Sequence, residues 1–185
     1  KTGQFIWKQP YTGAGCAGRE FCHAGISQVV TAAPGVVLAG SMDGVLQVVE
    51  VRRGLEADVA ALAAQRMTPD KARVIVEALA HLEACPPQGS EGVEADLAFH
   101  RSIASATDNP HYERLLSFLE QYQREAMRVT RTNEALDSGY MVEVREEHRA
   151  IAEAVMRGDV LAARQAAMLH MHNAARRLNN AAPPI

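Results

Sequence analysis

The stretch Glu94-Ala-Asp-Leu-Ala-Phe-His100 combines two metal-ligating side chains with the apolar pattern of a buried helix. On a helix, Asp96 and His100 lie four residues apart, so their side chains leave the same face one turn apart. Apolar residues surround the pair, namely Leu97, Phe99 and Ile103. A carboxylate in or beside a core needs a partner, which can be a divalent cation, a buried arginine or a set of hydrogen bonds. This stretch alone leaves the three open.

The composition is that of one soluble, mainly helical domain. Of the 185 residues, 48% are hydrophobic, 22% are charged and only 5% are aromatic. Beyond about Asp43 the chain is dominated by alanine, leucine, valine, glutamate and arginine, which favours helix over sheet. The formal net charge of -3 argues against a nucleic-acid-binding surface on this chain, because such domains usually carry a basic excess.

The cysteines and the apolar runs bear on the cellular compartment. Cys16, Cys22 and Cys85 are an odd number without a repeated CxxC, so we expect neither a disulfide framework nor a thiolate zinc site. Cys16 and Cys22 with His23 lack a fourth zinc ligand. The opening residues lack the apolar core of a signal peptide, and the run 29–40 is too short to span a bilayer. We therefore expect a cytoplasmic protein with reduced cysteines.

Two segments of different character are predicted along the chain. Residues 1–42 are rich in glycine and have no sustained helical period, so we expect an irregular segment with short strands at Gln4–Lys8 and Val36–Leu38. From residue 43 to about residue 180, apolar residues recur at spacings of three and four. Helices are predicted at about residues 45–66, 69–85, 91–107, 110–131, 140–157 and 159–178. Short connections between them predict an all-α, antiparallel six-helix bundle.

Two further histidines lie on the apolar stripes of the last two predicted helices. His148 stands between Val144 and Ile151, and His170 follows Ala167 by three residues. Facing helices of a bundle supply metal ligands from such inward positions. With Asp96 and His100 they would offer one oxygen and three nitrogens, a set that suits Zn, Mn, Ni, Fe or Co better than Ca or Mg. Histidines that are only hydrogen-bonded within the core remain the alternative.

Arg52 interrupts the apolar stripe of the first predicted helix. Its guanidinium can extend to solvent or form an internal ion pair with a glutamate or aspartate. It can also act as an anion receptor, because a guanidinium beside a metal would bind a small carboxylate at both ends. In that case the bundle would hold a polar cavity suited to a small ligand.

Four separated motifs follow one another along the chain. They are Val51-Arg-Arg-Gly-Leu-Glu56, Asp96-Leu-Ala-Phe-His100, Glu147-His-Arg-Ala-Ile151, and Gly158-Asp159 with the alanine-rich helix to His170. Together, over about residues 43–178, they resemble the effector-binding FCD domain of FadR-type GntR transcriptional regulators. The resemblance implies a helical bundle that binds a divalent metal, often zinc, beside a small organic or sugar acid.

The resemblance also assigns roles to particular residues. The implied metal ligands are Asp96, His100, His148 and His170, and Arg52 is the implied contact of the effector carboxylate. The resemblance also implies a homodimer. It further implies an attached winged helix-turn-helix whose affinity for operator DNA changes when the effector binds. Residues 1–42 do not read as three helices and a wing, although Lys1–Ile6 is similar to the end of a wing. We therefore expect a remnant of a truncated DNA-binding domain there.

Three functions are compatible with these patterns. The first is a non-enzymatic sensor that binds a metal and an organic acid. The second is a metal-dependent enzyme that uses the Asp/His site, and the third is a purely structural dimerisation bundle. We favour the sensor, because no general base accompanies the four ligands at a motif-like spacing and a third histidine leaves fewer open coordination positions.

Overall fold

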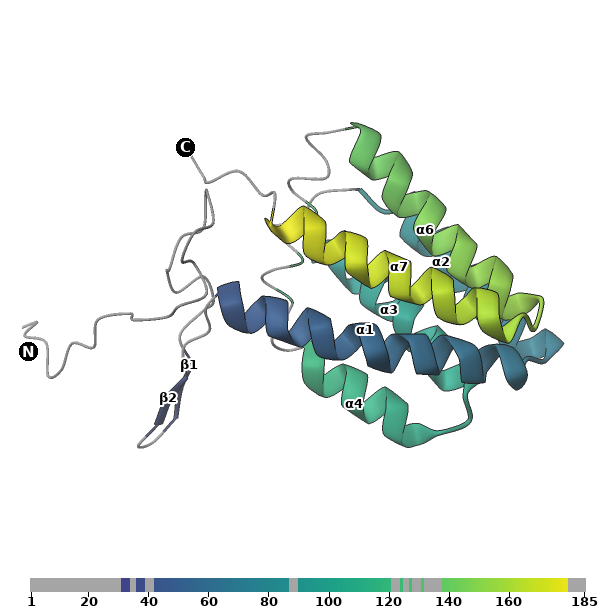
Figure 1. Cartoon of the computed structure of the whole chain (residues 1–185), viewed down its shortest axis with the longest axis horizontal. Coiled ribbons are helices and arrows are strands. Elements are labelled where there is room, and N and C mark those ends of the chain that lie inside the picture. The colour runs from purple at the N-terminus through teal and green to yellow at the C-terminus, as the bar shows by residue number, and fades with distance from the viewer. Residues whose placement is uncertain are drawn as a thin grey trace, which may run out of the picture.

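The structure is a computed structural model that describes residues 31–33, 36–38, 42–86, 90–120, 124, 127, 131 and 138–179. Six helices lie within these residues and form a bundle (Figure 1). They are α1 (Met42–Gln65), α2 (Pro69–Ala84), α3 (Ser90–Ala106), α4 (Pro110–Glu120), α6 (Ser138–Met156) and α7 (Val160–Asn179). The predicted all-α bundle is therefore confirmed.

Most helix bounds agree with the sequence pattern to within three residues. The predicted helix 110–131 is described as α4 only to Glu120; Arg124, Met127 and Arg131 are also helical, and the rest of that stretch lies outside the described residues. In the N-terminal segment, strands β1 (Thr31–Ala33) and β2 (Val36–Leu38) pair antiparallel. The strand predicted at 36–38 is thus confirmed, and the one predicted at 4–8 lies outside the described residues.

Local signals set the helix ends. Thr68 caps α2, and its side chain accepts a hydrogen bond from the Lys71 amide at 3.4 Å, with Pro69 in the first turn. Gly158 adopts a φ of 69° just after α6, a left-handed conformation that favours glycine. The Asp159 carboxylate then accepts from the Ala162 amide at 3.0 Å and caps α7. These turns reverse the chain and keep successive helices antiparallel.

Small side chains bring α1 and α7 together along their length (Figure 1). Ala60, Ala63 and Ala64 of α1 and Ala163 and Ala167 of α7 all belong to the buried core. Alanines at a helix contact let the backbones approach closely, so larger residues from other helices complete the core. Those larger side chains include Phe99, Ile75, Leu116, Ile151 and Val155.

Helix α3 occupies the interior of the bundle, because it packs against α1, α2 and α4. Ten of its residues are buried, including the polar Asp96 and His100. The stretch that predicted a buried helix with two inward ligands thus lies where the pattern placed it. The fold positions those two polar groups for the site described next.

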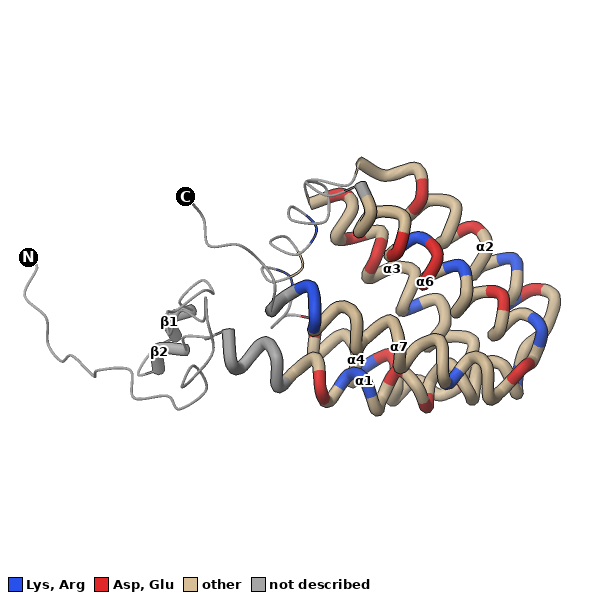
Figure 2. Tube along the Cα trace, turned by 45° about the horizontal axis from the view of Figure 1, so that its top comes forward, with Lys and Arg blue, Asp and Glu red and all other residues tan. Residues whose placement is uncertain are grey.

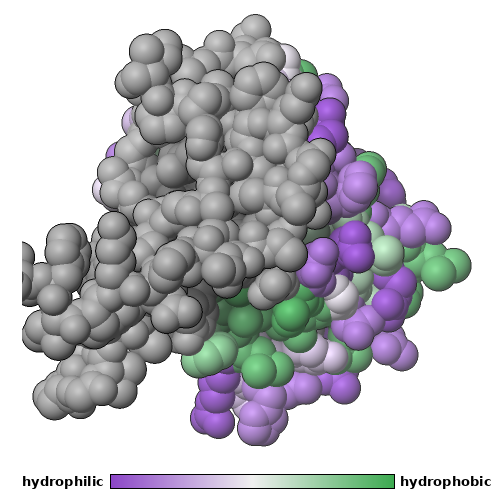
Figure 3. Space-filling view, turned by 60° about the vertical axis from the view of Figure 1, so that its left-hand side comes forward, coloured by the Kyte–Doolittle hydropathy of each residue, from purple (hydrophilic) through white to green (hydrophobic). Residues whose placement is uncertain are grey.

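The outside of the bundle carries intermixed charges and some apolar side chains. Figure 2 shows acidic and basic residues interspersed along the helices. Figure 3 shows hydrophobic side chains gathered on one face beside the atoms drawn in grey. Exposed large apolar residues include Leu115 and Phe118 of α4 and Leu161 and Leu169 of α7. None of the described helices has the length and apolar character that crossing a bilayer requires.

Candidate metal centre

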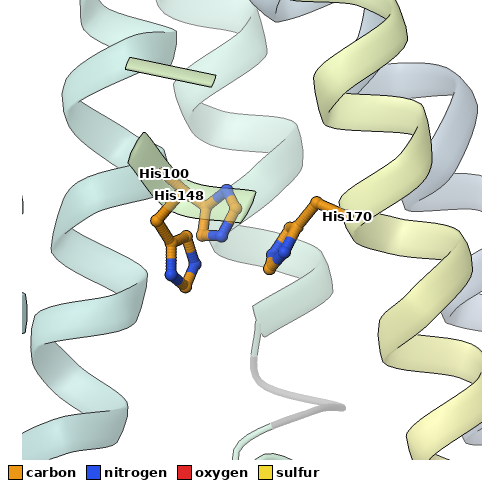
Figure 4. Close-up of side chains that lie close together, drawn as sticks. All are labelled: His100, His148 and His170. Carbon is orange, nitrogen blue, oxygen red and sulfur yellow. The ribbon is translucent and has the colours of Figure 1, made fainter. Parts of the chain in front are cut away.

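Three histidines from three helices converge inside the bundle. His100 of α3, His148 of α6 and His170 of α7 each offer one nitrogen, and these nitrogens all lie within 4.8 Å of one another. Figure 4 shows the three rings close together. Their centroids are 4.5 to 5.6 Å apart, and each side chain is buried. The structure thus brings together the three histidines that the sequence singled out.

Asp96 reaches this cluster through His148. The Asp96 Oδ1 atom lies 3.1 Å from His148 Nε2, and the carboxylate is buried. On its other side, the Nη1 atom of Arg131 lies 3.8 Å from the same oxygen. All four residues predicted as metal ligands therefore form one continuous group, with Asp96 at its edge.

Two of the histidine rings contact buried glutamates through their Nδ1 atoms. The sequence analysis did not single out these glutamates. Glu56 Oε2 of α1 lies 2.6 Å from His100 Nδ1, and Glu147 Oε2 of α6 lies 2.8 Å from His170 Nδ1. A carboxylate on one ring nitrogen fixes the tautomer and orients the other nitrogen toward a metal. Both glutamates were inside the quoted motifs, at Val51–Glu56 and Glu147–Ile151.

Buried arginines hold these glutamates in turn. Arg52 forms an ion pair with Glu56 one helical turn away, and both side chains are buried. The internal ion pair left open for Arg52 is therefore present, whereas its contact with an effector stays a prediction. Arg177 donates two hydrogen bonds to Glu147, at 3.0 and 2.9 Å. Such paired, charge-assisted bonds make the carboxylate geometry rigid.

The surroundings keep the carboxyl groups ionised. Burial alone would raise the pKa of Glu56, but Arg52 and His100 outweigh it and lower the pKa to about 2. Burial likewise opposes ionisation of Glu147, and the hydrogen bonds from His170 and Arg177 lower its pKa to about 2. The pKa of Asp96 falls well below its usual range, because the nearby His148 imidazole outweighs burial.

The two histidines that pair with glutamates have pKa values shifted in opposite directions. Burial lowers the pKa of His100, but the adjacent Glu56 carboxylate and Asp96 raise it above the usual value overall. Burial and the neighbouring His148 and His100 lower the pKa of His170 to about 4, although Glu147 opposes them. His170 is therefore neutral at physiological pH, which is the form that binds a metal.

An unsatisfied nitrogen provides a test of whether a metal would fit. His100 Nε2 is buried and has no hydrogen-bond partner in the described part of the chain, whereas His148 Nε2 lies 3.1 Å from Asp96 Oδ1. A buried polar atom without a partner costs about 1–3 kcal/mol. A cation bound by His100 Nε2 would remove this cost, and His148, His170 and the nearby Asp96 oxygen would complete a four-ligand set. The donor atoms fit a divalent transition metal.

A small cavity adjoins the cluster at His148. Its volume is about 40 Å³, and its lining includes Arg131, Arg145 and Glu83. On a scale where one water needs roughly 10–15 Å³, it has room for about three waters. The cavity therefore offers cationic side chains beside a candidate metal ligand. Three other histidines, His81, His111 and His172, are exposed.

Comparison with known proteins places the chain among transcriptional regulators. The model of the FCD domain matches residues 47–173. The HTH-type transcriptional regulator LutR of Bacillus subtilis is 33% identical over 162 residues, covering 87% of this chain and 72% of that protein. The galactonate operon transcriptional repressor of Escherichia coli is 30% identical over 129 residues, covering 70% of this chain and 55% of that protein. This chain spans about half the length of the latter relative.

The fold comparison agrees with the sequence comparison. The solved structure of E. coli McbR/YncC aligns with a TM-score of 0.68 at 17% identity, covering 82% of this chain and 77% of that chain. Both of these relatives are transcriptional regulators, which agrees with the expectation of a non-enzymatic function. The chain belongs to the FCD domain family.

Proposed function

We propose that residues 43–180 form the effector-sensing domain of a GntR/FadR-type transcriptional regulator that binds a divalent metal and a small organic acid. The observation that carries the proposal is the convergence of His100, His148 and His170 next to Asp96. Glutamates and arginines support the ligands from behind, an arrangement typical of metal sites with an ordered outer shell.

Asp96, His100, His148 and His170 would hold the metal. Zinc is the first candidate, because its common ligands are imidazole and carboxylate groups; nickel, manganese and iron also suit one oxygen and three nitrogens. The metal would act as a fixed cation that attracts the carboxylate of the effector. Since the family is one of regulators, we propose binding without turnover.

The effector would enter the cavity beside His148. Arg131 and Arg145 line this cavity and offer positive charge to a carboxylate. The limited volume favours short carboxylic acids, although a sugar acid could bind if the side chains around the cavity moved. Arg52 stays in the proposal as the contact implied by the family resemblance. Because it is paired with Glu56, it would have to share its guanidinium between Glu56 and the acid.

The signal would pass through the helices that carry the ligands. Metal and acid together contact α3 and α6, so bound effector would favour one arrangement of these helices over another. A second copy of the chain and operator DNA belong to the proposal as the partners of the family, with DNA bound through a winged helix-turn-helix. The exposed Leu115 and Phe118 of α4 provide apolar surface for association.

Metal content and thermal shift test this proposal. We would measure metals in the purified chain by elemental mass spectrometry, together with Asp96→Ala and the exposed-site control His172→Ala. We expect Asp96→Ala to contain about one equivalent of transition metal less than the parent and the control. A thermal-shift screen of short carboxylic acids and galactonate would follow, with metal present and removed. Equal metal content in all three proteins would refute the proposal, and so would a thermal shift with acid that is the same with and without the metal.

A further inference from the structure

A second cluster of metal-ligating side chains lies where α2 ends and α3 begins. His81, Cys85 and Glu91 each offer one ligand atom, and these atoms all lie within 4.8 Å of one another. The cluster shares no residue with the three-histidine group. It includes the one cysteine in the described part of the chain.

The end of α2 fixes the first two side chains of this cluster. His81 lies in the last turn of α2, and Cys85 follows four residues later as the residue that ends the helix. The Cys85 amide donates to the His81 carbonyl at 3.1 Å, so the helical turn persists to the cysteine. Residues four apart on a helix lie on one face, which places the imidazole and the thiol side by side.

The distances are close to those that a shared metal needs. Cys85 Sγ lies 4.0 Å from both ring nitrogens of His81. Zn–S and Zn–N bonds of about 2.3 and 2.0–2.1 Å at a tetrahedral angle separate sulfur and nitrogen by roughly 3.6 Å. Because Sγ is equidistant from the two nitrogens, neither lone pair points toward it, so metal binding would require the exposed His81 ring to turn as well as a closer approach of the sulfur. Glu91, in the first turn of α3, supplies a carboxylate from the other helix.

Solvent access and charge both bear on how a cation would bind here. Cys85 is buried, whereas His81 and Glu91 are exposed, so solvent can reach the site and a water can complete the coordination. Burial and the Glu91 carboxylate raise the pKa of the Cys85 thiol, and a metal would have to displace its proton. Such a site would release a proton on binding and weaken in acid.

We propose that His81, Cys85 and Glu91 form a second site, for a thiophilic divalent metal such as zinc. Thiolate, imidazole and carboxylate together suit zinc and its cobalt substitute better than calcium or magnesium. Cys85 also lines the cavity that His148 and Arg131 line. A metal bound at the second site would thus lie at the wall of the proposed effector cavity and would link α2 to α3.

Cobalt(II) titration distinguishes this site from the three-histidine centre. A cobalt–thiolate bond gives charge-transfer absorption in the near ultraviolet, and the three-histidine centre contains no cysteine. We would titrate the full chain carrying Cys16→Ser and Cys22→Ser, so that Cys85 is the remaining thiol. We expect a saturable band that zinc abolishes, that His100→Ala leaves in place and that Cys85→Ser removes.

The remaining variants decide whether the three residues act together. His81→Ala and Glu91→Gln should each weaken cobalt binding at least tenfold, whereas the control His111→Ala, at an exposed histidine of α4, should leave it unchanged. If the serine background does not fold, the difference between the intact chain and Cys85→Ser gives the same information. Absence of the band in both backgrounds, or a band that His81→Ala and Glu91→Gln leave unaltered, would overturn the proposal.

Discussion

Glu56 Oε2 lies 2.6 Å from His100 Nδ1, and the other ring nitrogen of His100 is buried without a hydrogen-bond partner in the described part of the chain. A carboxylate that accepts the Nδ1 proton leaves the lone pair of a neutral imidazole on Nε2. The ring is thereby oriented as a donor for a cation. The buried Glu56 carboxylate therefore has a role, which is to fix the tautomer and the orientation of the His100 ring.

Replacing Glu56 tests the importance of this orientation. Glu56→Gln keeps the size of the side chain and removes its charge. We expect metal affinity to fall roughly 10- to 100-fold, the usual cost of losing an outer-shell carboxylate. Chelator competition followed by calorimetry measures the change. Glu153→Gln, at an exposed glutamate of α6, is the matched control, and an equal effect in both variants would contradict a specific role for Glu56.

Removing a ligand should lower metal content and stability together. For His148→Ala and His170→Ala we expect loss of the metal bound by the three histidines and a fall in melting temperature of roughly 5–10 °C. A ligand at 100 times its Kd contributes about 2.7 kcal/mol, and each kcal/mol shifts the melting temperature of a chain of this size by about 2–4 °C. Differential scanning calorimetry measures the shift.

Chelation separates two causes of the lower melting temperature, namely the loss of the metal and the cavity that each alanine leaves. With EDTA present, the difference between the parent and the variants should shrink to the packing loss alone. His172→Ala serves as the control, because His172 lies on the same helix as His170 and is exposed. A difference that EDTA does not reduce would assign both histidines to packing rather than to metal binding.

The buried carboxylates should make the metal-free protein sensitive to acid. The folded-state pKa of Glu56 lies at about 2, below its ordinary value of 4.5. Its stabilising contribution is therefore present above pH 4.5 and is lost as the pH falls toward 2. At about 1.4 kcal/mol for each pKa unit, this contribution is roughly 3 kcal/mol. Urea denaturation of EDTA-treated protein between pH 7 and pH 3 measures it.

His170 extends the same trend to higher pH. Its pKa is about 4 in the folded protein and 6.5 ordinarily, so the unfolded chain binds a proton first and stability falls between these values. The raised pKa of His100 acts in the opposite direction near neutral pH. In Glu56→Gln the loss below pH 4.5 should be smaller than in the parent. An unchanged pH profile in that variant would rule out the proposed contribution of Glu56.

The sequence predicted the helices and the histidine cluster because both depend on local spacing. Asp96 and His100 share a face by the geometry of one helix, and His148 and His170 each interrupt an apolar stripe. The partners of those rings were not predicted. Whether Glu56 or another carboxylate reaches His100 depends on how α1 rotates against α3, and no single-helix pattern contains that rotation.

The same reason applies to the site at Cys85. Sequence spacing argued against a thiolate zinc site, because the cysteines show no repeated CxxC. The His81-x-x-x-Cys85 spacing was a usable local signal, but Glu91 belongs to the next helix. Only the packing of α2 against α3 brings the carboxylate to the other two side chains. The cluster is therefore a tertiary feature.

Arg131 is the residue whose replacement should separate effector binding from metal binding. It lines the cavity beside His148, and its Nη1 atom lies 3.8 Å from Asp96 Oδ1. We expect Arg131→Gln to weaken binding of a short carboxylic acid roughly 10- to 100-fold, the cost of about 1.5–3 kcal/mol for a charge-assisted hydrogen bond. Metal content should persist, because Arg131 is not among the proposed ligands.

Isothermal titration with the acid that gives the largest thermal shift measures this change. Arg124→Gln is the control, since Arg124 is a half-exposed arginine paired with Glu94.

Gly92→Ala tests Arg131 independently, without replacing it. A Cβ at position 92 would lie 2.7 Å from Arg131 Nη2 and 2.7 Å from the Pro86 carbonyl oxygen. Because the backbone carbonyl cannot move as easily as the guanidinium, the methyl group should displace Arg131 and also lower stability. Acid binding that survives both Arg131→Gln and Gly92→Ala would exclude Arg131 from the effector site and direct the search to Arg52 and Arg145.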